Sequence, residues 1–365
     1  MDLTVNFGTV GFGMIARTHL MAMQANLALH PDEPRGRPYA LCTRRPKECE
    51  GLPYDVIYTD IDELVADEAV QVVDVCTPNH LHVPVAEAAV NAGKTIYVEK
   101  PISDNMDGAL HLCKLVKDKG IPNQVALMMR FRHDVNRTKD LLDAGVIGEP
   151  IHFRCYFFHS SYLDPKRPTS WRQTLSQAGG GGLLDLGIHM VDLMRYLLGR
   201  EVTSLDAKLR TINKQRYTSA ESTDTVANET DEYACLSMLL EGGVVGVLES
   251  SRISGSAFAD AAFEVFGTGG SLLLTLIGKD GILIKKNGVV SEPDSPPGPY
   301  ETALKHLLPD QRQSMSPFIN AHAAALQNIS RMAVKQPGFI GTPTLDEGAK
   351  AQALVTQSFQ TAVWS

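Results

Sequence analysis

Short apolar runs alternate with longer amphipathic segments over the first third of the chain. Apolar runs rich in valine and isoleucine are typical of buried strands, and apolar residues three or four positions apart are typical of helices. We predict strands at 4–10, 39–42, 72–76, 95–98 and 124–127, and helices at 15–29, 61–66, 83–92 and 106–119. Strands that alternate with helices form crossover units. Residues 1–127 are therefore predicted to form an α/β domain with a doubly wound parallel sheet.

The pattern changes after residue 127 to successive strands joined by hairpin signals. Glycine pairs in Glu241-Gly242-Gly243 and Thr268-Gly269-Gly270, and the Asn287-Gly288 dipeptide, are typical of tight turns between antiparallel strands. We predict strands at 149–158, 202–212, 232–240, 244–251, 263–266, 271–276 and 281–286, and helices at 136–144, 183–198, 317–334 and 345–362. Residues 128–365 are therefore predicted to form an α+β domain with a mostly antiparallel sheet.

Composition narrows the class of protein. The chain has 365 residues, of which 44% are hydrophobic and 21% charged, and its net charge is -8. An acidic protein lacks the basic face that nucleic acid requires, and no apolar run is long enough for a membrane helix. The six cysteines form no C-x-x-C pair, and the N-terminus shows no leader pattern. We expect a cytoplasmic protein without nucleic-acid or membrane partners.

A glycine turn follows the first predicted strand. In Gly11-Phe12-Gly13-Met14-Ile15-Ala16, Gly11 would permit the tight turn and Gly13 would let a pyrophosphate approach the backbone at Met14 and Ile15. The helix that begins here would then point its unpaired N–H groups at the phosphates. The alternative is a tight turn that binds nothing. The strand–turn–helix context favours a dinucleotide site.

The end of the second strand indicates which dinucleotide is used. NAD-binding domains of this kind usually carry an acidic residue there to hold the ribose 2′-hydroxyl. This chain instead has Thr43, Arg44 and Arg45, and guanidinium groups suit a 2′-phosphate. We predict that NADP(H) is favoured over NAD(H). The alternative is that these arginines are solvated surface charges and that NAD or both cofactors are used.

Two further motifs leave strands at their carboxyl ends, where ligands of open α/β sheets bind. Thr77-Pro78-Asn79 would shape a loop beside the nicotinamide ribose. His82 follows at the expected start of a helix, where hydrogen bonding is its main expected role and a cofactor contact is the alternative. Glu99-Lys100-Pro101 comes after the next strand. The Lys100 ammonium could hydrogen-bond a substrate oxygen and stabilise the alkoxide that develops during hydride transfer. Pro101 is a candidate for a cis peptide bond.

A glycine-rich segment introduces the remaining candidate chemistry. Gly179–Gly182 precedes a predicted helix in which Asp185 and His189 stand four positions apart, on one face. Gly187 between them would allow a ligand to approach closely. A histidine with an ordinary pKa is a suitable base for a hydroxyl proton. The alternative is that Asp185 and His189 only pack on an amphipathic helix. A metal site is not expected, because no cysteine or histidine stands at ligand spacing from them.

Together these motifs resemble a known family. The resemblance rests on Gly11-x-Gly13-x-x-Ala16, Thr77-Pro78-Asn79, Ala92-Gly93-Lys94, Glu99-Lys100-Pro101, Arg130-Phe131, Gly145-x-x-Gly148-Glu149, Asp185-x-Gly187-x-His189 and Thr342–Gly348. The chain is similar to the Gfo/Idh/MocA family of glucose-fructose oxidoreductase, inositol dehydrogenase and rhizopine catabolism proteins. The resemblance implies a Rossmann domain, an open sheet that joins subunits into dimers or tetramers, and sugar or cyclitol substrates.

The resemblance also implies roles for residues. Lys100, Asp185 and His189 become the catalytic set, with His189 as proton acceptor or donor. The implied substrate contacts are Arg130, His159, Trp171 and Arg172. The main prediction is an NAD(P)-dependent dehydrogenase or reductase that acts on a ring carbon. Two alternatives stay open: a redox-neutral glycosidase-type enzyme that retains its nicotinamide, and a sugar- or cofactor-sensing regulator without catalysis.

Overall fold

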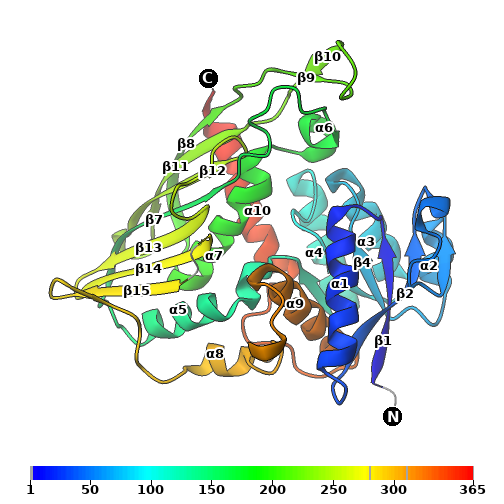
Figure 1. Ribbon diagram of the computed structural model, residues 1–365, viewed down its shortest axis with the longest axis horizontal. Helices are drawn as coiled ribbons and strands as arrows, with labels where there is room; N and C mark the ends of the chain where they lie inside the picture. Colours follow the sequence, from blue (N-terminus) through cyan, green and yellow to red (C-terminus); the bar gives the residue numbers. More distant parts are fainter. Residues whose placement is uncertain (1–2, 279–280, 310, 365) are drawn as a thin grey trace. The chain divides into compact units, whose positions relative to one another are not determined.

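The computed structural model describes residues 3–278, 281–309 and 311–364, and the chain folds into two compact units (Figure 1). Unit 1 consists of Met1–Arg132 and Thr302–Ala349, and unit 2 of His133–Glu301 and Lys350–Ser365. Within the described part of the chain, no helix is both long and apolar enough to cross a membrane.

Unit 1 contains a six-stranded parallel sheet with strand order β3-β2-β1-β4-β5-β6. Its elements are β1 (Thr4–Val10), α1 (Met14–Leu29), β2 (Arg35–Cys42), β3 (Val56–Tyr58), α2 (Ile61–Ala66), β4 (Val72–Val75), α3 (His82–Asn91), β5 (Thr95–Val98), α4 (Met106–Lys119) and β6 (Asn123–Val125). Every residue of β4 and β5 is buried, as expected for central parallel strands covered on both faces. The predicted doubly wound fold is confirmed. Because the strand order reverses between β1 and β4, the ends of these strands form the usual ligand-binding edge.

Two late segments belong to unit 1, whereas the sequence analysis grouped them with the second domain. Helix α9 (Pro317–Ala333) and the start of α10 (Leu345–Thr361) pack here. The Asn26 amide of α1 donates to the carbonyl of Ala323 at 2.8 Å, and Leu345 is part of the hydrophobic core of the parallel sheet. Such contacts join residues some 300 positions apart, so the hydrophobic periodicity of a short stretch of sequence cannot reveal them.

Unit 2 contains a nine-stranded mixed sheet with strand order β16-β15-β14-β13-β7-β12-β11-β8-β17. Its strands are β7 (Pro150–Phe158), β8 (Val202–Arg210), β11 (Tyr233–Leu240), β12 (Val245–Ser251), β13 (Ala261–Gly267), β14 (Gly270–Ile277), β15 (Gly281–Lys286), β16 (Val289–Ser291) and β17 (Val363–Trp364). The pairs β7–β12 and β8–β17 are parallel and the others are antiparallel. This confirms the predicted, mostly antiparallel sheet.

The other elements of unit 2 lie around this sheet. They are α5 (His133–Asp143), α6 (Leu175–Ala178), a π-helical turn (Leu183–Gly187), α7 (Ile188–Leu198), the short hairpin β9 (Gln215–Tyr217) and β10 (Thr225–Ala227), and α8 (Pro299–Leu304), whose end passes into unit 1. The hairpin and the π turn were not predicted. Arg137 donates to the carbonyls of Ser295 and Pro296, so the proline-rich loop at 291–300 is attached to α5.

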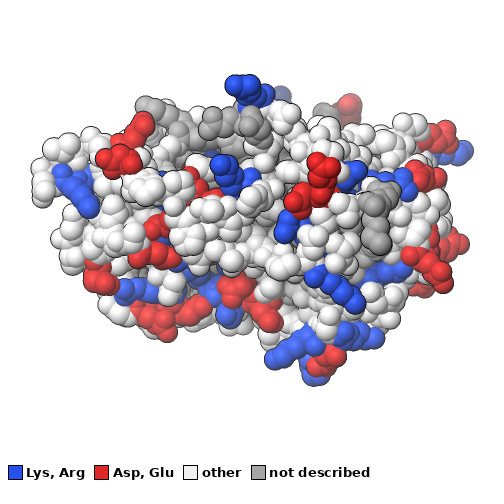
Figure 2. All heavy atoms as spheres, turned by 90° about the horizontal axis from the view of Figure 1, so that it is seen from below, with Lys and Arg blue, Asp and Glu red and all other residues white. Residues whose placement is uncertain are grey.

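The surface charge fits the acidic composition. On the face shown in Figure 2, Lys and Arg side chains are interspersed with Asp and Glu, and neither sign forms a continuous patch. A nucleic-acid interface would need clustered positive charge. That face of the molecule offers none.

Candidate active site

The turn after β1 has the geometry of a dinucleotide loop. Gly11 has a φ of +88°, and a Cβ there would lie 2.8 Å from the carbonyl oxygen of Cys76, so a side chain is excluded. A Cβ on Gly13, by contrast, would meet no atom within 4 Å. The space above Gly13 is therefore open to a ligand.

The start of α1 offers backbone donors beside this space. Gly13 occupies the N-cap position and no side chain caps the helix, while Met14 is 83% exposed and Ile15 is half-buried. The first N–H groups of a helix lack intrahelical partners, and the positive end of its dipole favours anions. The residues present therefore fit a pyrophosphate, and its contact with them stays a prediction.

A pocket of about 340 Å³ lies between this turn and the end of β2. Its lining consists of Phe12, Gly13, Met14, Arg17, Thr43, Arg45, Glu48 and Cys49. The guanidinium of Arg45 pairs with Glu48 at 3.0 Å, and that of Arg17 lies 4.5 Å from the ring centroid of Phe12. Arg44 is exposed and is not among the lining residues. Arg17 was not predicted to be a pocket residue, because only the packing of α1 beside β2 brings it there.

The loops after β4 and β5 are joined through His82. Its Nδ1 lies 2.7 Å from the carbonyl oxygen of Pro101, and its Nε2 lies 2.9 Å from that of Thr77. Burial lowers the pKa of His82. The structure thus gives His82 the expected hydrogen-bonding role at a helix start, and its contact with a cofactor stays a prediction.

Lys100 is half-buried at the carboxyl end of β5, and the Lys100–Pro101 peptide bond is cis, as predicted. The backbone N–H of Lys100 donates to the Glu99 carboxylate at 3.2 Å. Pro78 and Asn79 are half-buried at the neighbouring loop. Unit 1 therefore gathers Thr77, Asn79 and Lys100 at the carboxyl edge of its sheet.

A buried charge cluster that the sequence analysis missed lies beneath Lys100. His19 of α1 places Nδ1 3.0 Å from Asp74 and Nε2 3.4 Å from Glu99, and all three side chains are buried. Burial disfavours the charged imidazole, but Asp74 and Cys76 together outweigh this effect and hold the pKa of His19 well above its usual value. Burial also opposes the Glu99 carboxylate, yet its contact with His19 lowers the pKa of Glu99. An imidazolium between two carboxylates accounts for this arrangement.

The same cluster has atoms at ligand spacing. Single ligand atoms of His19, Glu99 and His322 lie within 4.8 Å of one another, as do those of His19, Asp74 and Cys76. Because the carboxylates already face a charged His19, the ion-pair interpretation needs no metal. The sequence prediction that no metal binds stays a prediction.

In unit 2, Asp185 and His189 lie on consecutive turns, but the helix differs from the prediction. Asp185 belongs to the π-helical turn and His189 to α7, which begins after it. Asp185 is half-buried and His189 is buried. A Cβ on Gly187 would lie 2.6 Å from the Leu183 side chain, so packing explains this glycine without a ligand.

The glycine run before the π turn wraps around a carboxylate. Asp231 accepts hydrogen bonds from the N–H groups of Gly181 at 2.8 Å and Leu183 at 2.7 Å. A Cβ on Gly181 would lie 2.0 Å from the Asp231 carbonyl oxygen. The run is therefore needed for this close approach, which fixes the start of the segment that carries Asp185 and His189.

The four implied substrate contacts differ in their surroundings. Arg130 is 4% exposed and donates to Glu347 at 3.2 Å within unit 1. His159 Nδ1 lies 2.8 Å from the Ser161 hydroxyl, and the Arg172 guanidinium lies 4.4 Å from the centroid of a Trp171 ring. Arg130 is thus held inside unit 1, whereas the other three lie on the 159–172 segment of unit 2. Their contact with substrate stays a prediction.

Both halves of the chain match one family. Residues 5–127 match the oxidoreductase family with an NAD-binding Rossmann fold, GFO_IDH_MocA, and residues 135–273 match the GFO/IDH/MocA C-terminal domain. A levoglucosan dehydrogenase from Pseudarthrobacter phenanthrenivorans is 28% identical over 297 residues, which cover 76% of this chain and 75% of that protein. An inositol 2-dehydrogenase from Rhizobium meliloti is 26% identical, with 74% of this chain and 75% of the relative covered.

A D-xylose 1-dehydrogenase [NADP(+)] from Haloarcula marismortui is 27% identical, over 62% of this chain and 59% of its own length. Among solved structures, an NAD-binding oxidoreductase from Klebsiella pneumoniae superposes with a TM-score of 0.86 at 25% identity, covering 98% of this chain and 96% of that one. A levoglucosan dehydrogenase in complex with NADH and levoglucosan superposes with a TM-score of 0.87 at 24% identity, covering 98% and 97%, and shows the shared fold. The chain belongs to the GFO/IDH/MocA family of NAD(P)-dependent oxidoreductases.

Proposed function

We propose that this oxidoreductase transfers hydride between a nicotinamide cofactor and a ring carbon of a sugar, sugar derivative or cyclitol. The observation that carries the proposal is the presence of Lys100 at the end of β5 together with Asp185 and His189 on the π turn and α7. Relatives of this chain include levoglucosan, D-xylose and inositol dehydrogenases, whose substrates all present hydroxyl groups on carbon. This shared chemistry favours a polyhydroxylated substrate.

Each catalytic residue has a defined part in the proposal. The Lys100 ammonium donates a hydrogen bond to the substrate oxygen and stabilises its developing negative charge, an effect worth about 10²–10³ in rate. An imidazole nitrogen of His189 accepts the hydroxyl proton, or returns it in the reductive direction. Asp185 accepts a hydrogen bond from a second hydroxyl and orients the ring. The nicotinamide, when bound, supplies the hydride acceptor or donor.

The cofactor we propose is NADP(H) in preference to NAD(H). Arg17, Thr43 and Arg45 line the pocket at the end of β2, where guanidinium groups would pair with a 2′-phosphate. Glu48 opposes this preference because it pairs with Arg45 and brings a negative charge to the pocket. The relatives do not decide the matter, since a D-xylose dehydrogenase named for NADP(+) and a levoglucosan dehydrogenase in complex with NADH are both among them.

The proposal is tested by turnover of levoglucosan, D-xylose and myo-inositol with NAD⁺ and NADP⁺, followed by nicotinamide absorbance. We expect Lys100→Met to lower kcat by about 10²–10³ while NAD(P)H binding is retained. Lys94→Met is the matched control. Lys94 stands just before β5, at the end of the strand opposite to Lys100, and its ammonium donates to the carbonyls of Asp67 and Val70. If Lys100→Met and Lys94→Met both keep wild-type turnover, the assignment of Lys100 is wrong.

The two alternatives give other results in the same experiment. Cofactor that purifies with the protein and turnover of a glycoside without net absorbance change would indicate a redox-neutral enzyme. Binding of NAD(P)H and polyol without turnover would indicate a regulator. The intact set of Lys100, Asp185 and His189 favours the dehydrogenase.

We further propose that the unit 2 sheet joins subunits into a dimer or tetramer. Leu239, Val245 and Val247 on its outward face are 40–50% exposed, and Leu239 of β11 pairs with Val245 of β12. Contiguous exposed apolar side chains on a sheet favour a protein–protein interface.

The six cysteines form no disulfide in the described part of the chain, which fits the proposed cytoplasmic location.

A further inference from the structure

Arg252 holds the carboxylate of Asp185. The residue follows the last position of β12, and its side chain is only 3% exposed. Its Nε and Nη2 lie 3.2 and 3.0 Å from Oδ2 of Asp185, so two N–H groups donate to one oxygen. A guanidinium keeps its charge at all physiological pH values, and its planar edge restricts the orientation of the carboxylate it binds.

The backbone of Arg252 is itself fixed on both sides. Its N–H donates to the Glu232 carbonyl at 2.9 Å, and its carbonyl accepts from the N–H of Tyr162 at 3.0 Å. The Arg252 guanidinium also lies 5.3 Å from the centroid of the Tyr162 ring. The position of Arg252 therefore depends on the loop after β7, which begins with His159 and contains Tyr162.

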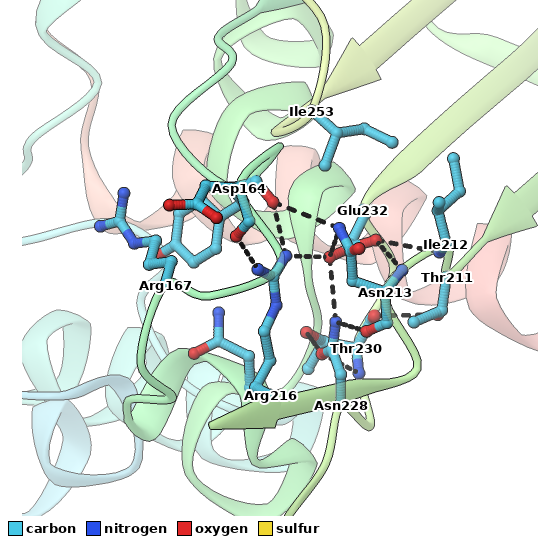
Figure 3. A network of polar contacts seen from close by, with 12 residues as sticks. Asp164, Arg167, Thr211, Ile212, Asn213, Arg216, Asn228, Thr230, Glu232 and Ile253 are labelled. Carbon is cyan, nitrogen blue, oxygen red and sulfur yellow. Dashed lines mark hydrogen bonds and ion pairs between the residues drawn. The ribbon is translucent and has the colours of Figure 1, made fainter. Parts of the chain in front are cut away.

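That loop is anchored by the network in Figure 3. Arg216 is fully buried, and it donates to the carbonyls of Asp164 at 2.7 Å and Tyr162 at 2.6 Å and to the Glu232 carboxylate. Glu232 also accepts from the backbone N–H of Asn213 at 2.7 Å. A buried ion pair that also forms several hydrogen bonds restricts the conformations available to the segments it joins. Arg252 is thus attached to a rigid part of unit 2.

We propose that Arg252 is a positioning residue for the reaction, which keeps Asp185 in the orientation that the substrate requires. The proposal rests on the proposed function, in which Asp185 binds a substrate hydroxyl. Because the loop that carries His159 fixes the backbone of Arg252, the orientation of Asp185 depends on the same segment that supplies the proposed substrate contacts.

The kinetic test compares Arg252→Met, Arg252→Lys and Arg195→Met. Arg195 is a matched control, because it is 6% exposed and binds Glu201 through Nε and Nη2 at 2.7 and 2.6 Å. Displacement of a substrate-binding group by about 1 Å costs up to about 10²-fold in rate. We expect Arg252→Met to lower kcat/KM about 10- to 100-fold, mainly through kcat, and Arg252→Lys to restore part of it. Arg195→Met should stay within about twofold of wild type; equal effects of the two methionine variants would overturn the proposal.

A second measurement does not depend on turnover. In thermal unfolding, Asp185→Asn should lower the midpoint because it removes the negative charge that the buried guanidinium binds. The double variant Asp185→Asn/Arg252→Met should then be no less stable than Arg252→Met alone. If wild type turns over none of the three probe polyols, the proposed function fails, and this non-additivity still tests the pair. Additive midpoint changes would show that Arg252 does not hold Asp185.

Discussion

Replacement of His19 by glutamine removes the cation that lies between Asp74 and Glu99. Glutamine can keep one hydrogen bond to Asp74 but cannot compensate the charge of either carboxylate. The two N···O distances are 3.0 and 3.4 Å, and the side chains of His19 and Asp74 are fully buried. Loss of one partner from a buried ion pair costs about 3–5 kcal/mol, because the remaining charge has lost its compensation. We expect a loss of unfolding free energy in this range.

The loss should depend on pH in a defined direction. The pKa of His19 is raised, so its contribution is complete below the unfolded value of about 6.5 and is lost as pH rises through the folded pKa. The pKa of Glu99 is lowered, so its contribution is present above the unfolded value and is lost as pH falls through the folded pKa. The difference between wild type and His19→Gln should therefore be largest near pH 5–6 and should decrease toward alkaline pH.

Urea unfolding followed by circular dichroism at several pH values measures this difference. His111→Gln is the control, since His111 forms an exposed pair with Glu87 at 3.3 Å and such pairs contribute about 0–1 kcal/mol. Asp74→Asn in the His19→Gln background should recover part of the stability by removing one uncompensated carboxylate. A loss below about 1 kcal/mol, or one that grows with pH, would refute the imidazolium interpretation.

Three shorter predictions test other parts of the structure. In fluorescence titrations, Arg45→Glu should weaken NADPH binding at least tenfold with little effect on NADH, and Glu48→Gln should strengthen NADPH binding. Gly181→Ala should lower the thermal midpoint strongly, because its Cβ would lie 2.0 Å from a carbonyl oxygen of Asp231. In analytical ultracentrifugation, Val247→Asp should shift the protein toward monomer, because it places a charge on the exposed apolar face; an unchanged mass would count against that interface.

Most of the fold could be predicted because it depends on local patterns. The helix predicted at 15–29 is α1 at Met14–Leu29, and the buried run predicted at 95–98 is β5. The Gly11 turn and the cis bond before Pro101 were also predicted, since each depends on residues adjacent in sequence. The π-helical turn around Asp185 was not, because the glycine run before it wraps around Asp231, about fifty positions away.

The residues that support the candidate site could not be predicted either, because they too come together from distant positions in the sequence. Arg17 reaches the pocket at the end of β2 only because α1 packs beside that strand, and Arg252 meets Asp185 across 67 positions of sequence. A lone arginine or histidine in a sequence is usually a surface charge. Only the tertiary structure shows that these two cations, Arg252 and His19, are buried.

Each of the two buried cations, His19 in unit 1 and Arg252 in unit 2, fixes the position of a carboxylate. His19 holds Glu99, whose carboxylate accepts the backbone N–H of Lys100, and Arg252 holds Asp185. Glu99 is the neighbour of Lys100, and Asp185 is itself a proposed catalytic residue. Each carboxylate faces a cation that remains charged in the interior, so the position of the carboxylate is fixed before any ligand binds. Substitutions of the two residues should therefore be separable. A change at His19 should affect the binding of NAD(P)H, which the unit 1 turn and pocket would hold, whereas a change at Arg252 should affect turnover of the polyol and leave NAD(P)H binding intact.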